Sequence, residues 1–289
     1  MSTQVHRLLA TAAEQLAPYS DSPELDAQVV LAHVFRKPRT WVLAHPTTNP
    51  DADQSAEIQR ILGRLQRGEP LPYVLGHQAF YGLDFDLTPD VLIPRPETEL
   101  LVERAIAWLK LSPDRRTAAD VGTGSGCICI SLAVHVPELR VLATDVSRPA
   151  LTVAVRNSRK HRVSDRLDFV ECDLLPRHIQ GLPTERHFDL VCANLPYIPT
   201  ASLRQLPVYR QEPWLALDGG ADGLDPFRRF FDLVPEWMAP GGLVLLEVES
   251  SHGAAVLSLA YDAFHAAIMH LHHDLAGYDR LLELQLPSA

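Results

Sequence analysis

Apolar residues recur at helical spacing through the N-terminal part of the chain. The recurring positions include Leu8, Leu9, Ala12, Leu16, Leu25, Val29, Val30, Leu31, Ala32 and Val34. Such a stripe is typical of amphipathic helices that share a core. Ser22 followed by Pro23 predicts a helix start, because the hydroxyl can cap free amides and proline needs no donor in the first turn. We expect residues 1–72 to form a small helical domain.

The pattern changes to short alternating segments between residues 73 and 96. Residues 77–81 and 83–87 alternate on either side of Gly82, which favours two strands joined by a turn. We interpret residues 73–96 as a β-hairpin connector.

Helical and strand-like segments alternate from residue 97 to residue 289. A helix is predicted to end at Lys110, and strands are predicted to end at Asp120 and Asp145 and to cover residues 167–170, 188–193 and 243–248. Alternation of this kind predicts an α/β domain with a parallel sheet and helices on both faces.

Composition and charge exclude several classes of protein. With 46% hydrophobic and 21% charged residues, the chain is expected to be globular rather than disordered. A formal charge of −10 argues against a protein that binds mainly by neutralising phosphates. The N-terminus resembles neither a signal peptide nor a membrane span, so we expect a soluble, cytoplasmic protein. We also expect a monomer. The four cysteines lack CxxC spacing and are expected to be reduced core thiols.

A glycine-rich turn joins the first predicted strand to the next helix. Its residues are Asp120, Val121, Gly122, Thr123, Gly124, Ser125 and Gly126. Glycines let the backbone approach a ligand, and a helix N-terminus offers free amides, although such a turn can also be purely structural. The glycines do not follow the G-x-G-x-x-G spacing of dinucleotide-binding proteins. Asp120 would repel a pyrophosphate but could face a cationic cofactor, which favours a sulfonium over a nicotinamide.

Two further carboxylates follow the next strands. Asp145 ends the second strand, 23 residues after Gly122, where a carboxylate can accept both ribose hydroxyls of a nucleoside. Asp173 follows the third strand and could accept from an exocyclic adenine amine, or be an ordinary solvated loop residue. A nucleoside-containing cofactor is therefore expected.

The motif Asn194-Leu195-Pro196-Tyr197 directly follows an apolar strand. In a doubly wound sheet this places it beside the glycine loop. The Asn194 side-chain carbonyl and the Leu195 backbone carbonyl can accept both hydrogens of a planar NH2 group, and Tyr197 can stack on its face. The structural alternative is a turn with an Asx hydrogen bond and a packed tyrosine. The motif favours methyl transfer to an amide or amine nitrogen, with catalysis by positioning and electrostatics.

These motifs resemble the HemK/PrmC protein-(glutamine-N5) methyltransferases over nearly the whole chain. The most specific stretches are residues 72–76, residues 80–82, and residues 91–99 with their Pro-Arg-Pro-Glu-Thr-Glu block; residues 212–225 and 274–280 are also similar. The resemblance implies a Rossmann-like class I methyltransferase domain with a mostly parallel seven-stranded sheet and a helical N-terminal domain that helps grip the substrate.

The same resemblance assigns the site. S-adenosyl-L-methionine, which leaves as S-adenosyl-L-homocysteine, would be held by residues 120–126, Asp145, Asp173 and Asn194, and residues 194–197 would hold the glutamine of the Gly-Gly-Gln motif in peptide chain release factors. No metal and no membrane partner are expected.

Leu195 departs from the family's usual Asn-Pro-Pro-Tyr motif, although a leucine retains the carbonyl that the site requires. Asn-Leu-Pro-Tyr is also similar to adenine N6-dimethylating rRNA enzymes, which leaves an N6-adenine methyltransferase of RNA or DNA as an alternative. A glutamine methyltransferase of a ribosomal protein and an inactive cofactor-binding adaptor are two further alternatives.

Several other residues receive no catalytic role. His265, His270, His272 and His273 lack metal-ligand spacing. Arg95 either shapes the cofactor pocket or pairs with Glu97 or Glu99. Large aromatics usually serve cores, so Trp214, Phe230 and Phe231 are interpreted as packing residues. Glu247 and Glu249 are interpreted as solvated.

Overall fold

A computed structural model describes residues 4–176, 187–274 and 276–288. The chain divides into two compact units, Met1–His77 and Gln78–Ala289. The division falls within strand β1 (His77–Phe80), which pairs with β2 (Leu83–Asp86) in a two-stranded sheet.

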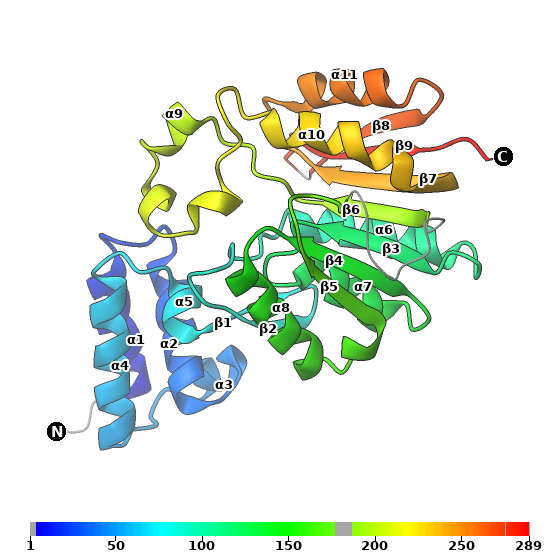
Figure 1. Cartoon of the computed structure of the whole chain (residues 1–289). Coiled ribbons are helices and arrows are strands. Elements are labelled where there is room, and N and C mark those ends of the chain that lie inside the picture. The colour runs from blue at the N-terminus through cyan, green and yellow to red at the C-terminus, as the bar shows by residue number, and fades with distance from the viewer. Residues whose placement is uncertain (1–3, 177–186, 275, 289) are drawn as a thin grey trace. The chain divides into compact units, whose positions relative to one another are not determined.

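The N-terminal unit is helical (Figure 1). Its helices are α1 (Val5–Leu16), α2 (Pro23–Phe35), α3 (Arg39–Ala44), α4 (Ala52–Leu65) and α5 (Leu71–Leu75). Their apolar stripes meet in a core that includes Leu16, Leu31 and Ile61. Helix α2 begins at Pro23 as predicted, but Ser22 makes no side-chain capping bond. The side-chain cap in this unit is instead the Asp51–Gln54 capping box of α4.

The C-terminal unit contains a seven-stranded sheet in the order β5-β4-β3-β6-β7-β9-β8. The strands are β3 (Thr117–Val121), β4 (Arg140–Asp145), β5 (Leu167–Glu171), β6 (Phe188–Ala193), β7 (Met238–Glu247), β8 (Ile268–His273) and β9 (Asp279–Gln285). The strands from β5 to β7 pair in parallel, and β9 pairs antiparallel with both β7 and β8. The predicted mostly parallel sheet is confirmed.

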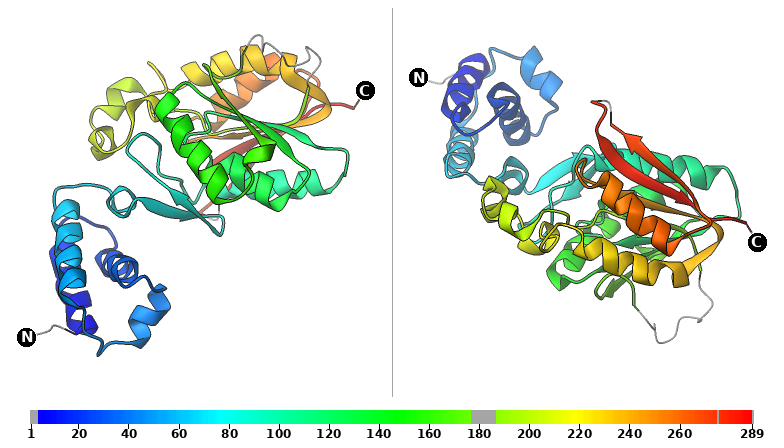
Figure 2. Two further views of the ribbon diagram at one scale, coloured as in Figure 1. Left: turned by 60° about the horizontal axis from the view of Figure 1, so that its bottom comes forward. Right: turned by 90° about the horizontal axis from the view of Figure 1, so that it is seen from above.

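Helices cover both faces of this sheet (Figure 1; Figure 2). Helices α6 (Thr98–Lys110) and α7 (Cys127–His135) share one core with alternate strand residues such as Ala118. Helices α10 (Asp225–Leu233) and α11 (Gly253–Ala263) share the other core with residues such as Ala119. Successive side chains along a strand therefore pack on opposite faces of the sheet, as the pleated backbone requires. The remaining helices are α8 (Arg148–Lys160), α9 (Thr200–Leu203) and four 3-10 turns at Ser164–Arg166, Pro207–Arg210, Trp214–Ala216 and Val234–Trp237.

The strand order reverses at β3, which lies between β4 and β6. Val121 at the end of β3 is in register with Thr144 of β4 and with Ala193 of β6. The segments that follow these strands therefore leave the sheet side by side. Open α/β sheets bind ligands at such a switch point.

Two expectations from composition can be compared with the described residues. Cys129 and Cys192 are buried, Cys127 and Cys172 are partly buried, and all four are free thiols. Within the described part of the chain, no helix combines the length and apolarity needed to cross a bilayer.

Candidate functional site

The glycine loop turns sharply between β3 and α7. Gly122, Gly124 and Gly126 all have positive φ, at 74°, 54° and 82°, a conformation that other residues rarely adopt. A Cβ at Gly126 would lie 2.7 Å from Ile130 Cδ1 and 3.2 Å from Ala154 Cβ, so this glycine permits close helix packing. Gly122 and Gly124 instead line a cavity.

Asp120 is fully buried beneath the loop. Its Oδ2 accepts from the Thr123 hydroxyl at 2.6 Å and from the Cys129 amide at 3.0 Å. Burial raises the pKa of Asp120 to about 6, although these bonds oppose the shift. Asp120, Thr123, Ser125 and Gly126 do not line the cavity in this structure, and the bonds to Thr123 and Cys129 let Asp120 brace the loop. The buried Oδ1 atom of Asp120 has no hydrogen-bond partner among the described residues.

Asp145 ends β4 and faces the glycine loop. Its Oδ2 accepts from the Gly124 amide at 2.9 Å and its Oδ1 from the Ser147 amide at 2.8 Å. Desolvation nevertheless raises the pKa of this carboxyl. Each oxygen keeps a further lone pair, and Asp145 lines the cavity, so it can still accept from ligand hydroxyls.

Asp173 lines the same cavity but is already paired. Its carboxylate accepts from Arg229, which also lines the cavity, and both side chains are more than half exposed. Sequence reasoning did not foresee this pair.

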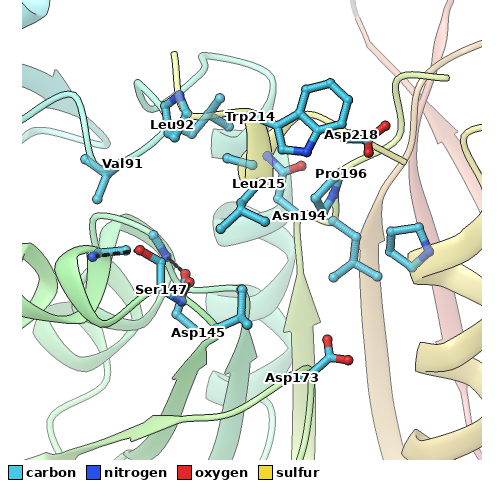
Figure 3. Close-up of a pocket in the computed structure, with 18 of the residues that line it drawn as sticks. Val91, Leu92, Asp145, Ser147, Asp173, Asn194, Pro196, Trp214, Leu215 and Asp218 are labelled. Carbon is cyan, nitrogen blue, oxygen red and sulfur yellow. Dashed lines mark hydrogen bonds between the residues drawn. The ribbon is translucent and has the colours of Figure 1, made fainter. Parts of the chain in front are cut away.

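The cavity has a volume of about 410 Å³, within the range of small-molecule sites. Figure 3 shows Asp145, Asp173 and Asn194 around it, together with Trp214 and Leu215 from the 3-10 turn Trp214–Ala216. Trp214 is only partly buried and belongs to the cavity wall, where its ring also packs edge-on against Tyr209. Phe230 and Phe231 are core residues as expected.

Residues 194–197 follow β6, and backbone contacts with segment 217–223 hold their C-terminal end in place. The Ile198 amide donates to the Leu217 carbonyl at 3.0 Å, and the Ile198 carbonyl accepts from the Gly219 amide at 2.9 Å. A Cβ at Gly223 would lie 2.3 Å from the Tyr197 carbonyl oxygen. The glycine-rich segment 219–223 therefore permits a contact with the Tyr197 backbone that other residues would block.

A second cavity of about 190 Å³ adjoins the first at Asn194, Leu195 and Pro196, which line both. It is also lined by Arg95 and Tyr197. Burial raises the pKa of Tyr197 to about 12, which keeps the phenol neutral. Among the described residues that line the two cavities, none is histidine, lysine or cysteine.

Two buried side chains that sequence reasoning did not assign lie behind Asn194. The Asn194 Nδ2 donates to the Thr98 hydroxyl at 3.2 Å, and this hydroxyl donates to Glu247 Oε2 at 2.5 Å. Glu247 is only 4% exposed, so its interpretation as solvated was wrong. Burial raises the pKa of Glu247 to about 7, partly opposed by the Thr98 bond.

The raised pKa of Glu247 gives stability a specific pH dependence. The folded protein holds the Glu247 proton up to a pKa near 7, whereas the unfolded chain releases it near 4.5. The free energy of unfolding of wild type therefore falls as pH rises between these two values. We expect Glu247→Gln, which does not titrate, to become more stable relative to wild type by roughly 3 kcal/mol between pH 4.5 and pH 8. Urea unfolding across this range measures the difference in free energy of unfolding between the variant and wild type. A difference that does not change with pH would contradict a raised pKa for Glu247.

Arg95 pairs with neither Glu97 nor Glu99. Its Nη2 donates to Glu212 Oε1 at 2.5 Å, and Glu212 Oε2 accepts from the Ile93 amide at 3.0 Å. Arg95 also lines the second cavity, and the Glu212 side chain is only 4% exposed. The Glu212 carboxylate therefore links segment 93–95 by hydrogen bonds to the loop that precedes Trp214.

We expect Glu212→Ala to lower the free energy of unfolding by roughly 2–3 kcal/mol, because two donors lose their buried acceptor. Urea denaturation checks this value. Glu57→Ala, which removes the exposed Glu57–Arg60 pair, is the matched control and should cost less than about 1 kcal/mol. Equal losses in the two variants would remove the special role of Glu212.

Comparison with known proteins places these features in a family. Residues 7–76 match the PrmC N-terminal domain, and residues 118–207 match a methyltransferase domain. A release factor glutamine methyltransferase of Moorella thermoacetica is 41% identical over 96% of this chain and 93% of its own length. Its counterpart in Bordetella pertussis is 38% identical over 90% and 93%. A methyltransferase from Pyrococcus furiosus shares the fold, with a TM-score of 0.51, 16% identity and coverage of 82% of this chain and 100% of that one. The chain therefore belongs to the release factor glutamine methyltransferases.

Proposed function

We propose that this protein transfers a methyl group from S-adenosylmethionine to the side-chain amide nitrogen of a glutamine, the one in the Gly-Gly-Gln motif of a peptide chain release factor. The observation that carries this proposal is the meeting of two cavities at residues 194–196. The larger cavity suits a nucleoside cofactor, and the smaller one suits a single extended side chain.

The residues around the larger cavity fit the cofactor. Gly122 and Gly124 let it approach the backbone, and Asp145 retains lone pairs for ribose hydroxyls. Trp214 and Leu215 offer apolar surface to an adenine ring. When bound, S-adenosylmethionine supplies an electrophilic methyl on a sulfonium and leaves as S-adenosylhomocysteine, while the amide nitrogen releases one proton to solvent.

The smaller cavity orients the amide. The Asn194 Nδ2 donates a hydrogen bond to the Thr98 hydroxyl. The Asn194 Oδ1 is then left to accept one N–H of the glutamine, and the Leu195 carbonyl accepts the other. Two acceptors in the amide plane draw electron density from both N–H bonds and fix the orientation of that plane, so that the lone pair on the face of the nitrogen points at the methyl group. Tyr197, a neutral phenol, stacks on the amide plane. Positioning and electrostatics supply the catalysis.

The release factor contacts more than this cavity. We expect the helical unit, which includes the family's N-terminal domain at residues 7–76, to help grip it. Translation termination takes place in the cytoplasm, so we expect the enzyme to act there, as a monomer and without nucleic acid as substrate.

A transfer assay with radiolabelled S-adenosylmethionine tests the proposal. The acceptors are purified release factor, the same factor with its Gly-Gly-Gln glutamine replaced, a large-subunit ribosomal protein, and single-stranded and duplex nucleic acid. We expect label on the unmodified release factor only. Label on nucleic acid alone would identify an adenine methyltransferase, and label on the ribosomal protein alone would identify a different protein substrate.

A further inference from the structure

Three side chains from distant parts of the chain form a hydrogen-bonded row behind the acceptor cavity. Thr98 is the first residue of α6, Asn194 follows β6, and Glu247 ends β7. Ala193 is in register with Leu246, so Asn194 and Glu247 leave adjacent strands at the same level. Thr98 is 2% exposed and Glu247 is 4% exposed, so these two members of the row are shielded from water.

The direction of these hydrogen bonds follows from the chemistry of their ends. An ionised carboxylate can only accept, and a threonine hydroxyl has a single proton. When Glu247 is ionised, Thr98 must donate to it, and the lone pairs of Thr98 are then left to accept from Asn194. The Asn194 amide is held with its nitrogen toward Thr98 and its oxygen toward the acceptor cavity.

A protonated Glu247 removes this constraint. Its carboxyl can donate to Thr98, which is then free to donate to the Asn194 oxygen. The asparagine amide would rotate and present its NH2 group to the substrate NH2 group. Two donors facing each other cannot form a hydrogen bond, so this arrangement is unproductive.

Burial has the largest influence on the pH at which this change occurs, and the charges around Glu247 adjust it. Glu97 disfavours its ionised form, whereas Arg280 and Arg95 favour it. Its carboxylate in turn raises the pKa of Tyr197 and of Cys127. The net effect of burial and these charges is a pKa of about 7 for Glu247, where a switch in hydrogen-bond direction is measurable.

We propose that Thr98 and Glu247 are positioning residues that select the productive orientation of the Asn194 amide. This inference rests on the proposed glutamine methylation, because it concerns the same acceptor. It adds two residues that touch neither the cofactor cavity nor the acceptor cavity, and it adds a pH dependence that a simple packing role would not produce.

The test uses the full chain, with release factor as substrate, between pH 6 and pH 8.5. We expect wild-type kcat to fall below about pH 7, and Thr98→Val to reduce kcat by roughly 10²-fold. The KM for release factor and the calorimetric Kd for S-adenosylmethionine should each change by less than a few fold. Thr98→Ser, which restores the hydroxyl, should recover most of the turnover.

Glu247→Gln separates charge from shape. A glutamine at this position can both donate and accept, so we expect reduced kcat that no longer varies between pH 6 and pH 8.5. Ser131→Ala is the control for disturbing the interior, since this buried hydroxyl has no hydrogen-bond partner among the described residues; its profile should match that of wild type.

The outcomes are distinct. Wild-type kcat in Thr98→Val, or a wild-type acid limb in Glu247→Gln, would overturn the positioning role. A wild-type kcat that does not change between pH 6 and pH 8.5 would also overturn the positioning role. This measurement needs no variant, so it holds even if a variant fails to fold. Failure of wild type to methylate release factor at any pH would instead overturn the proposed function.

Discussion

Replacing Asn194 by alanine is expected to lower kcat by roughly 10²–10³-fold while the Kd for S-adenosylmethionine changes by less than a few fold. The variant loses the side-chain oxygen that accepts one N–H of the substrate amide, and nothing in the glycine loop or at Asp145 is altered. Single-turnover transfer to release factor measures the chemical step, and calorimetry measures cofactor binding.

The Asn194→Ala result has a matched control in Asn49→Ala, which truncates an exposed asparagine of the helical unit and should leave both quantities within a few fold of wild type. Equal losses of turnover and cofactor affinity in Asn194→Ala would assign the residue to the cofactor rather than to the acceptor. The backbone carbonyl of Leu195 is unaffected by the substitution, which explains why some activity should remain.

Replacing Asp145 by alanine is expected to raise the Kd for S-adenosylmethionine by roughly 10–100-fold, the equivalent of about 1.5–3 kcal/mol for a charged hydrogen bond. The variant also leaves the Gly124 and Ser147 amides without their acceptor. At saturating cofactor, kcat should recover most of its wild-type value, because the acceptor cavity is unchanged.

Asp173→Ala provides the comparison for Asp145→Ala. Its carboxylate is more than half exposed and already paired with Arg229, so we expect a loss of affinity several-fold smaller. Equal Kd values for wild type and Asp145→Ala would exclude Asp145 from the cofactor site, and a larger effect at Asp173 would reverse the ranking of the two carboxylates.

The features that could be predicted from the sequence are those encoded over short distances. Alternating apolar segments predicted the parallel sheet, and the positions of Gly122 and Asn194 directly after apolar strands placed them at one edge. Periodicity and turn chemistry are local properties, and the topology of a doubly wound sheet then brings the strand ends together.

The residues that were missed depend on contacts between distant segments. Thr98 and Glu247 are 149 positions apart, and Arg95 and Glu212 are 117 apart. A glutamate at the end of a strand has the same local sequence signal whether it is solvated or buried. The signal that was available lay in the Pro-Arg-Pro-Glu-Thr-Glu block, which contains both Arg95 and Thr98, but a motif does not indicate which partners its side chains will meet.

The register of β3 against β6 has a consequence for how this enzyme can change. Because the glycine loop and the acceptor motif leave paired positions on adjacent strands, the gap between the backbone origins of these two segments is set by interstrand spacing, roughly 4.8 Å. Insertions elsewhere on the surface can alter which protein is recognised without altering that gap. Substrate choice and the placement of the two motifs can therefore evolve independently, since that placement is a dimension of the backbone ladder itself.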